Sequence, residues 1–276
     1  YSTAGEISSF TFEAWVKTDY SGGGSTANWA FIDFDRSEYY NVYAHIDGRL
    51  SFSTTDNTGA THDMYADSTV NDGEWHHVAA VYDGTDKILY LDGEEVDRAV
   101  NPHNGNSLGS GSTRYGFIGD GSEAGSFDGG RNNSYYEGQV DEVRIWNTVR
   151  TLTEINHYKN RTLLGSESDL LAYYPMDEGP GSDTLSDRSV NNHTGTLFNM
   201  DPSTDWIKTA YNLECTSCES ARDTVTAFVN SIPVVDLATD TVNNNDTIIL
   251  QGANYPVVST FPYLEDFEAG QGNWLS

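Results

Sequence analysis

The segment covering residues 119–133 holds the side chains of this chain that could bind a metal ion. It reads Gly-Asp-Gly-Ser-Glu-Ala-Gly-Ser-Phe-Asp-Gly-Gly-Arg-Asn-Asn, so carboxylate and amide oxygens are closely spaced among glycines. Calcium takes about six to eight oxygen ligands from carboxylates, amides, backbone carbonyls and water. The composition therefore predicts a calcium site in this loop. The alternative is a solvated Asn- and Gly-rich loop that binds no metal.

A second group of side chains, on a strand expected near residues 39–46, could bind a sugar. Alternate residues of a strand point to opposite faces, so one half of this segment is expected in the core and the other half in solvent. The expected core residues are Tyr40, Val42, Ala44 and Ile46. The predicted sugar platform on the solvated face, with two carboxylates of the preceding strand, consists of Asp33, Asp35, Tyr39, Asn41, Tyr43 and His45. Aromatic rings stack on pyranose faces while amides and carboxylates hydrogen-bond to hydroxyls; an ordinary aromatic strand surface is the alternative.

The carboxylates and histidines do not form a recognisable catalytic site. A glycosidase pair flanks the scissile bond with its carboxyl groups about 5 to 10 Å apart. Asp141 and Glu142 are neighbours on an expected strand, so their side chains point to opposite faces and cannot share one site. No Ser or Cys accompanies His76 and His77 in a nucleophile signature, so these histidines are expected in the core or at a sheet edge. The sequence predicts no catalytic residues and no enzymatic activity.

Two cysteines, Cys215 and Cys218, form a Cys-x-x-Cys pair. Structural zinc requires four ligands, and neither a second cysteine pair nor a histidine cluster supplies the other two. A thioredoxin-like role would place the pair between a strand and a helix, which the flanking residues do not indicate. We therefore expect a local disulfide formed in an oxidising compartment.

Antiparallel strands would have to position these side chains. In residues 10–17 apolar side chains alternate with polar ones, the pattern of a half-buried strand, whereas in residues 137–147 apolar side chains lie on both faces. Thr151, with Glu154 three positions later, is typical of a capping box and predicts a short helix. The fold is therefore predicted to be all-β apart from one short helix. Strands are expected near residues 9–18, 28–35, 39–46, 49–55, 74–83, 86–92, 113–119, 137–147 and 170–176.

Four segments, in this order along the chain, resemble the laminin G-like, concanavalin A-like jelly-roll family, which is related to the pentraxins. They are EAWVK at 13–17, GEWHHVAAVYDG at 73–84, LYLDGE at 89–94 and GQVDEVRIWN at 138–147. The resemblance covers about residues 1–210. It implies a sandwich of two antiparallel sheets that often holds calcium, usually binds glycans or proteins, and usually catalyses no reaction.

The resemblance also implies roles for particular residues. In the pentraxins the loop that corresponds to residues 119–133 carries the calcium ligands. The matching candidates are Asp120, Asp128, Asn132 and Asn133. The pentraxin Glu-Gln-Asp triplet is absent here, which argues against a double calcium site. A second acidic cluster is expected to hold the sheet edge through hydrogen bonds from side chains to the backbone. Its members are Asp177, Glu178, Asp187, Asn191 and Asn192.

The composition limits the possible partners. Across 276 residues, 42 acidic side chains face 14 basic ones, a formal net charge of -28. Such a charge disfavours nucleic acid and anionic membranes as partners and favours cations. No apolar run approaches the roughly 20 residues that span a bilayer. The abundance of Gly, Asn, Asp, Ser and Thr is typical of turn-rich β proteins outside the cell.

The expected organisation is a jelly-roll domain over residues 1–210, a linker over 211–260 that contains the cysteine pair, and the start of another module at 261–276. The chain then reads as a piece of a longer modular protein. We expect a binding module of a secreted or cell-surface adhesin, of the gliding-motility type found in Bacteroidetes, which recognises a glycan or surface protein with calcium-ordered loops and lies beside other modules of the same chain. One alternative is a carbohydrate-binding accessory module of a polysaccharide-degrading enzyme, and another is a structural spacer.

Overall fold

A computed structural model describes residues 2–3, 5–20, 28–121 and 135–207 of this chain. All of them belong to the first of two units, Tyr1–Ser217, whereas the second unit, Cys218–Ser276, lies outside the described residues. The predicted disulfide Cys215–Cys218, the linker and the following module also lie outside them. So do three of the predicted calcium ligands, Asp128, Asn132 and Asn133.

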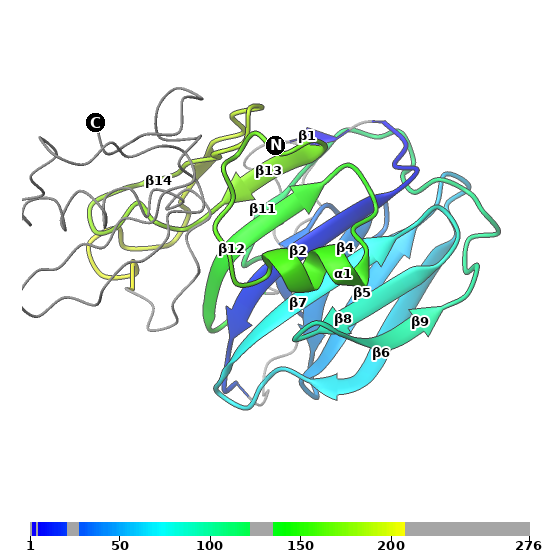
Figure 1. Ribbon diagram of the computed structural model, residues 1–276, viewed down its shortest axis with the longest axis horizontal. Coiled ribbons are helices and arrows are strands. Elements are labelled where there is room, and N and C mark those ends of the chain that lie inside the picture. The colour runs from blue at the N-terminus through cyan, green and yellow to red at the C-terminus, as the bar shows by residue number, and fades with distance from the viewer. Residues whose placement is uncertain (1, 4, 21–27, 122–134, 208–276) are drawn as a thin grey trace, which may run out of the picture. The chain divides into compact units, whose positions relative to one another are not determined.

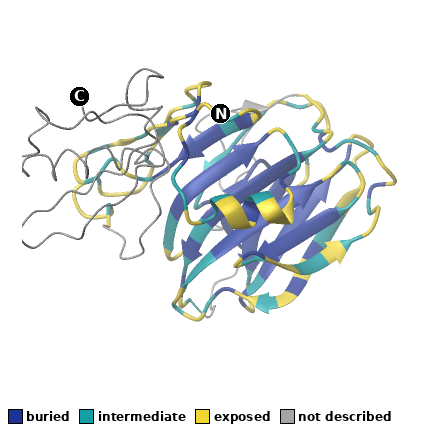
Figure 2. Ribbon diagram, in the orientation of Figure 1, coloured by how far each residue is buried: buried dark blue, intermediate teal, exposed yellow. Residues whose placement is uncertain are grey.

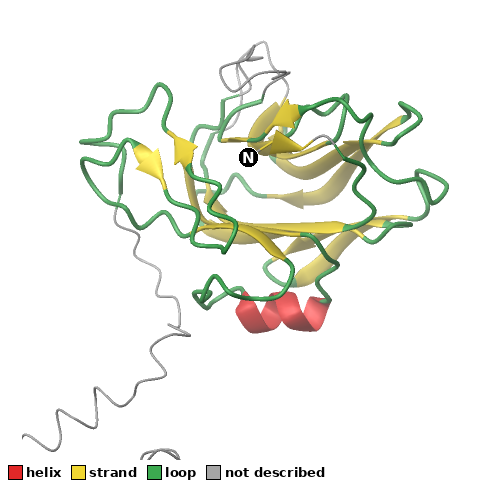
Figure 3. Ribbon diagram, turned by 90° about the horizontal axis from the view of Figure 1, so that it is seen from above, coloured by secondary structure: helices red, strands yellow, loops and turns green. Residues whose placement is uncertain are grey.

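Two antiparallel sheets face each other, with a helix on the outer side of one of them (Figures 1 and 3). The six-stranded sheet has the order β13-β12-β2-β7-β8-β9 and the five-stranded sheet the order β11-β3-β4-β5-β6. The strands of the first are β2 (Phe10–Lys17), β7 (Trp75–Tyr82), β8 (Lys87–Leu91), β9 (Glu94–Ala99), β12 (Gln139–Trp146) and β13 (Leu170–Tyr174). Those of the second are β3 (Asn28–Asp33), β4 (Tyr40–His45), β5 (Arg49–Thr55), β6 (Thr61–Thr69) and β11 (Phe117–Ile118).

The predicted all-β jelly-roll sandwich is confirmed. Two short pairs complete the described strands, β1 (Ser2–Thr3) with β10 (Arg114–Tyr115) and β14 (Thr184–Leu185) with β15 (Gly195–Thr196). The helix α1 (Leu152–Tyr158) begins with the predicted capping box, in which Thr151 and Glu154 exchange hydrogen bonds. Strands β6 and β9 were not predicted, because their residues are mostly polar. Among the described residues, no helix is long and apolar enough to cross a lipid bilayer.

The inner faces of the two sheets form the main core (Figure 2). The predicted core residues of β2, Phe10 through Val16 at alternate positions, are buried. Phe10 stacks on Tyr40 of the opposite sheet with ring centroids 4.3 Å apart. Burial of aromatic rings from both sheets is the main source of stability for such a sandwich, because each ring removes a large apolar area from water.

The outer face of the six-stranded sheet is covered as well. Helix α1 lies against this face (Figure 3), and its Ile155 packs with Ala79 and Ile88. The expectation that β2 is half-buried was therefore wrong, since Thr11 and Glu13 on its outer face are fully buried. Strand β12 is covered on both faces, as predicted. The alternating pattern identifies the two faces of β2 but does not reveal what packs on the polar one.

The acidic cluster that follows β13 has the structural role that was expected of it. The Asp187 carboxylate accepts hydrogen bonds from the backbone N–H of Tyr173 at 2.9 Å and of His193 at 2.7 Å. The Asn191 amide donates to the backbone oxygens of Leu170 and Leu171. These bonds attach the segment after β13 to the edge of the sheet and leave the Asp187 oxygens occupied.

Candidate functional site

Two oxygen-bearing side chains meet where β3 lies between β4 and β11, and a third follows β11 close enough to act on one of them electrostatically. Asp33 of β3 pairs in register with Asn41 of β4 and with Phe117 of β11. Asp120 follows β11 and contributes to the electrostatic environment of Asp33. All three are buried, with 5 % of Asp33, 4 % of Asn41 and 7 % of Asp120 exposed. Two residues predicted for a sugar platform thus lie beside one predicted for calcium.

The electrostatics of this cluster favour a cation. Burial, and to a smaller extent the carboxylates of Asp35 and Asp120, raise the pKa of Asp33 to about 8, against the opposing hydrogen bonds from the Asp35 N–H and the Asn41 amide. The Asn41 amide donates to Asp33 Oδ2 at 3.4 Å, while its own Oδ1 is buried with no hydrogen-bond donor among the described residues. A hard cation would be stabilised by both oxygens.

The two carboxylates of Asp33 and Asp120 fit a calcium site only when the Asn41 amide oxygen is counted as a third side-chain ligand. Within the described ranges, no three His, Cys, Asp or Glu side chains are grouped as a metal site. Asp33, Asn41 and Asp120 would supply three side-chain ligands, and backbone carbonyls and water would have to complete the coordination of about six to eight oxygens. We define these three residues as the Asp33 cluster.

Asp35 does not belong to this cluster. Its Oδ1 accepts hydrogen bonds from the N–H and hydroxyl of Ser37, at 3.1 and 2.6 Å. Its Oδ2 accepts from Arg114 Nε at 2.6 Å. The residue has a φ of 61° and shapes the turn between β3 and β4. The expectation that Asp35 binds a ligand is therefore not supported by its geometry, since both oxygens are occupied within the protein.

The expected row of solvated side chains on β4 is wrong for three of its four members. Tyr39 is fully buried in the main core and donates its hydroxyl to the backbone oxygen of Ser112 at 2.8 Å. Tyr43 is 1 % exposed and shares a 3.1 Å hydrogen bond with Ser53 Oγ. Asn41 belongs to the Asp33 cluster, so only His45 is partly accessible. Conversely, Ile46 was expected in the core but lies in the turn after β4, 39 % exposed.

Strand β6 brings a tyrosine to this face that the sequence pattern did not single out. Tyr65 is 37 % exposed, and its register places it beside Ser51 of β5, which in turn pairs with Tyr43 of β4. In the segment Thr61–Thr69 only Met64 and Ala66 are buried, so the alternation of apolar and polar residues is short. The alternation of Met64, Tyr65 and Ala66 is the signal that could have identified Tyr65 as an outward-facing residue.

The two histidines of β7 occupy a core and an edge position. His77 is 1 % exposed and lies 3.4 Å from the carboxylate of Glu13. His76 lies between Asp92 and Asp72, at 2.8 and 3.0 Å. Hydrogen bonds that His76 donates to Asp92 and to Asp72 raise its pKa to about 9. Both imidazoles are held by carboxylates in structural contacts, as expected, and neither is placed beside a nucleophile among the described residues.

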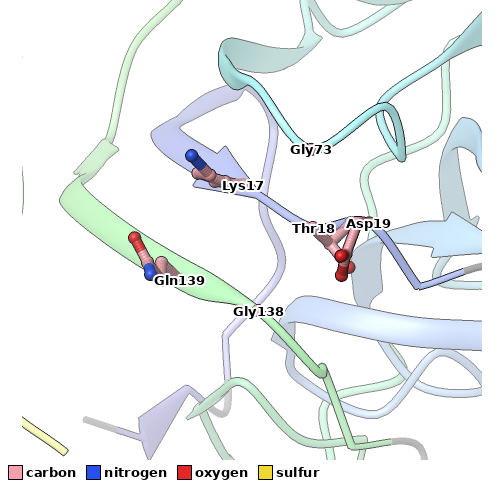
Figure 4. A pocket seen from close by; sticks show the side chains of 6 residues that line it. All are labelled: Lys17, Thr18, Asp19, Gly73, Gly138 and Gln139. Carbon is pink, nitrogen blue, oxygen red and sulfur yellow. The ribbon is translucent and has the colours of Figure 1, made fainter.

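A small pocket lies between the end of β2 and the start of β12 (Figure 4). Its volume is about 230 Å³, below the roughly 300 Å³ at which ligand cavities usually begin. The Thr18 hydroxyl donates to the backbone oxygen of Glu137 at 2.6 Å and joins its two sides. We do not assign a ligand to this pocket. The residues that line it are Lys17, Thr18, Asp19, Gly73, Gly138 and Gln139.

Comparison with known proteins identifies relatives of the sandwich. Residues 3–156 match the sequence profile of the concanavalin A-like lectin/glucanases superfamily. No curated protein matches the sequence. Among solved structures, a Bacteroides ovatus protein described as carbohydrate-binding aligns with a TM-score of 0.54 and 19 % identity, over 70 % of this chain and 53 % of that one. The alignment thus spans about half the length of that relative.

Two further structures align less closely. A pentraxin from Limulus polyphemus has a TM-score of 0.41 and 18 % identity, over 54 % of this chain and 69 % of its own. Domains LG4-5 of the mouse laminin alpha1 chain have a TM-score of 0.40 and 14 % identity, over 53 % of this chain and 38 % of that one.

Proposed function

This chain belongs to the concanavalin A-like lectin/glucanases superfamily, and we propose that it is a non-catalytic module that binds a glycan or a surface protein. The superfamily contains both lectins and glucanases, so membership alone does not separate binding from catalysis. The described residues favour binding, because the Glu142 carboxylate is buried and already accepts hydrogen bonds from Arg144 and from the Tyr173 hydroxyl. The proposed setting is a secreted or cell-surface adhesin.

The observation that carries the proposal is the Asp33 cluster. Burying Asp33 in this cluster is costly, because burial disfavours the ionised carboxylate. A bound calcium ion would offset that cost and order the loops around β11. Asp33, Asn41 and Asp120 would hold the ion, and Asp128, Asn132 and Asn133 are proposed as further ligands. Calcium would supply structural support and a coordination site for ligand hydroxyls, with no bond made or broken.

Binding without cleavage is the first expected result. The purified 276-residue chain applied to a glycan array in calcium-containing buffer should be retained on at least one glycan. Incubation with the corresponding polysaccharide should release no new reducing ends, because no acid and base pair is assembled. Retention on no glycan and on no cell-surface extract, or a steady release of reducing ends, would contradict the proposal.

Calcium should stabilise the folded protein. A ligand that binds only the folded state adds about 2.7 kcal/mol at a hundredfold excess over its dissociation constant. For a domain of this size that corresponds to a rise in the melting temperature of about 5–10 °C between EDTA and calcium. The substitutions Asp33→Asn and Asp120→Asn should abolish the difference.

Asp67→Asn is the matched control for the calcium experiment, since Asp67 is an exposed residue of β6 outside the cluster. This variant should melt like the unmodified protein in both buffers. Identical curves for the unmodified protein in EDTA and calcium would rule out the Asp33 cluster as a calcium site. The glycan experiment would still decide the binding function separately.

A further inference from the structure

The outer face of the five-stranded sheet carries a group of accessible side chains around Tyr65. They come from β4, β5, β6 and the turns beside them, and Figure 1 shows these strands side by side. We name this group the Tyr65 surface. Its members are Arg36, His45, Asp47, Arg49, Asp63 and Tyr65.

The side chains of the Tyr65 surface hold one another in place. The Arg49 guanidinium lies 5.2 Å from the centroid of the Tyr65 ring, and the His45 ring meets that ring edge-on, also at 5.2 Å. Asp47 joins the two, accepting from Arg49 Nε at 2.8 Å and lying 2.8 Å from His45 Nδ1. Such mutual contacts reduce the entropy that would be lost when a ligand orders these side chains.

A second ion pair lies next to Tyr65 on the same face, further along β6. Arg36 contacts the Asp63 carboxylate through both Nε, at 2.8 Å, and Nη2, at 2.5 Å. Asp63 lies on β6, two positions before Tyr65, so both point to the outer face. Between Tyr43 of β4 and the outward-facing residues of β6, strand β5 presents the small side chains of Ser51 and Ser53.

The charge of this surface selects among possible ligands. Each arginine is matched by a carboxylate, Arg36 by Asp63 and Arg49 by Asp47, so the surface has no excess positive charge. The chain as a whole has a formal net charge of -28. Long-range repulsion would therefore oppose an acidic glycan, and no unpaired cation of the surface would compensate.

We propose that the Tyr65 surface binds a neutral glycan, an inference that rests on the proposed binding function and names its site and ligand class. A pyranose would stack on the Tyr65 face opposite Arg49, because an aromatic ring offers an apolar platform to the C–H face of a sugar. The planar guanidinium and carboxylate groups around it would exchange hydrogen bonds with neighbouring hydroxyls. No residue of the Tyr65 surface belongs to the Asp33 cluster.

Affinity electrophoresis of the 276-residue chain tests this proposal. The gels would contain a neutral polysaccharide, one of a β-glucan, a galactomannan and an arabinoxylan, or the acidic polysaccharide alginate. Unmodified protein should be retarded in at least one neutral gel and not by alginate. Tyr65→Ala should lower the affinity at least tenfold, and Tyr65→Phe should keep most of it, because the ring remains.

Tyr135→Ala is the matched control, since Tyr135 is 46 % exposed and lies outside the Tyr65 surface. This variant should bind like the unmodified protein. All variants should have the melting temperature of the unmodified protein. Equal retardation of Tyr65→Ala and unmodified protein would overturn the Tyr65 surface while leaving the binding function intact. Retardation by alginate alone would overturn the neutral ligand class. Failure to bind any glycan here or on the array would instead overturn the glycan-binding function itself.

Discussion

Replacing Arg144 by alanine is expected to lower the free energy of unfolding by about 3–5 kcal/mol, the cost of breaking a buried ion pair by removing one partner. Arg144 has no exposed surface. Its Nη2 donates to Glu142 Oε2 at 2.6 Å and to the backbone oxygen of Arg161 at 2.6 Å, and its Nη1 donates to the backbone oxygen of Tyr158 at 2.9 Å. Alanine would leave a buried carboxylate and two backbone carbonyls without these donors.

Equilibrium unfolding in guanidinium chloride would measure the loss. Burial raises the pKa of Glu142 and Arg144 opposes that effect, so the variant should also take up a proton at Glu142. The double variant Arg144→Met with Glu142→Gln should recover part of the stability, because both charges are then removed together.

Arg98→Ala is a suitable control for Arg144. Its side chain forms ion pairs with Asp86 and Glu95 but is 35 % exposed. Exposed pairs contribute about 1 kcal/mol or less, because water and salt screen them. A loss in Arg144→Ala no larger than that of Arg98→Ala would mean that the buried network does not hold the segment after α1 against the sheet.

Lys87→Ala is expected to cost about 3 kcal/mol or more of unfolding free energy. Lys87, on β8 of the six-stranded sheet, is fully buried, and its Nζ donates at 2.8 Å to the backbone oxygens of both Phe52 and His62 in the other sheet. Truncation removes the apolar packing of the lysine methylene groups. It also removes the contact of Nζ with the Phe52 ring, whose centroid is 4.6 Å away. It also leaves two carbonyls without donors, each costing about 1–3 kcal/mol when no water replaces the lysine.

Lys87 also makes the stability depend on pH, in a direction that its lowered pKa determines. Burial lowers its pKa well below the ordinary value, so between the folded and unfolded pKa values the unfolded chain binds more protons than the folded one. Stability from this group therefore rises with pH until the unfolded lysine also loses its proton, near pH 10.4. Between pH 7 and pH 9.5, the free energy of unfolding of the unmodified protein should increase relative to that of Lys87→Met. The same change in the free energy of unfolding for both proteins would contradict a lowered pKa of Lys87.

The sandwich itself could be predicted from local patterns, because a period of two residues assigns the faces of a strand without knowledge of its partners. The strands around Phe12 and Ile145 and the capping box at Thr151 followed from residues close together in sequence, whereas the edge role of Asp187 followed from the resemblance to the family. The same reasoning failed for Tyr39, which packs in the main core, and for Tyr43, which lies on the face opposite the core but is buried there. Polar character on one face does not say whether solvent or protein covers it.

The sequence by itself determined the fold family, the strongly acidic character and the chemical types that a binding site could draw on. Only the tertiary structure decided which of these side chains meet. Asp33, Asn41 and Asp120 come together because β3 pairs with β4 on one side and β11 on the other, and Tyr65 reaches the accessible face because β6 pairs with β5. Strand pairing joins residues far apart in the chain through backbone hydrogen bonds that carry no side-chain signature, so a local pattern cannot predict it.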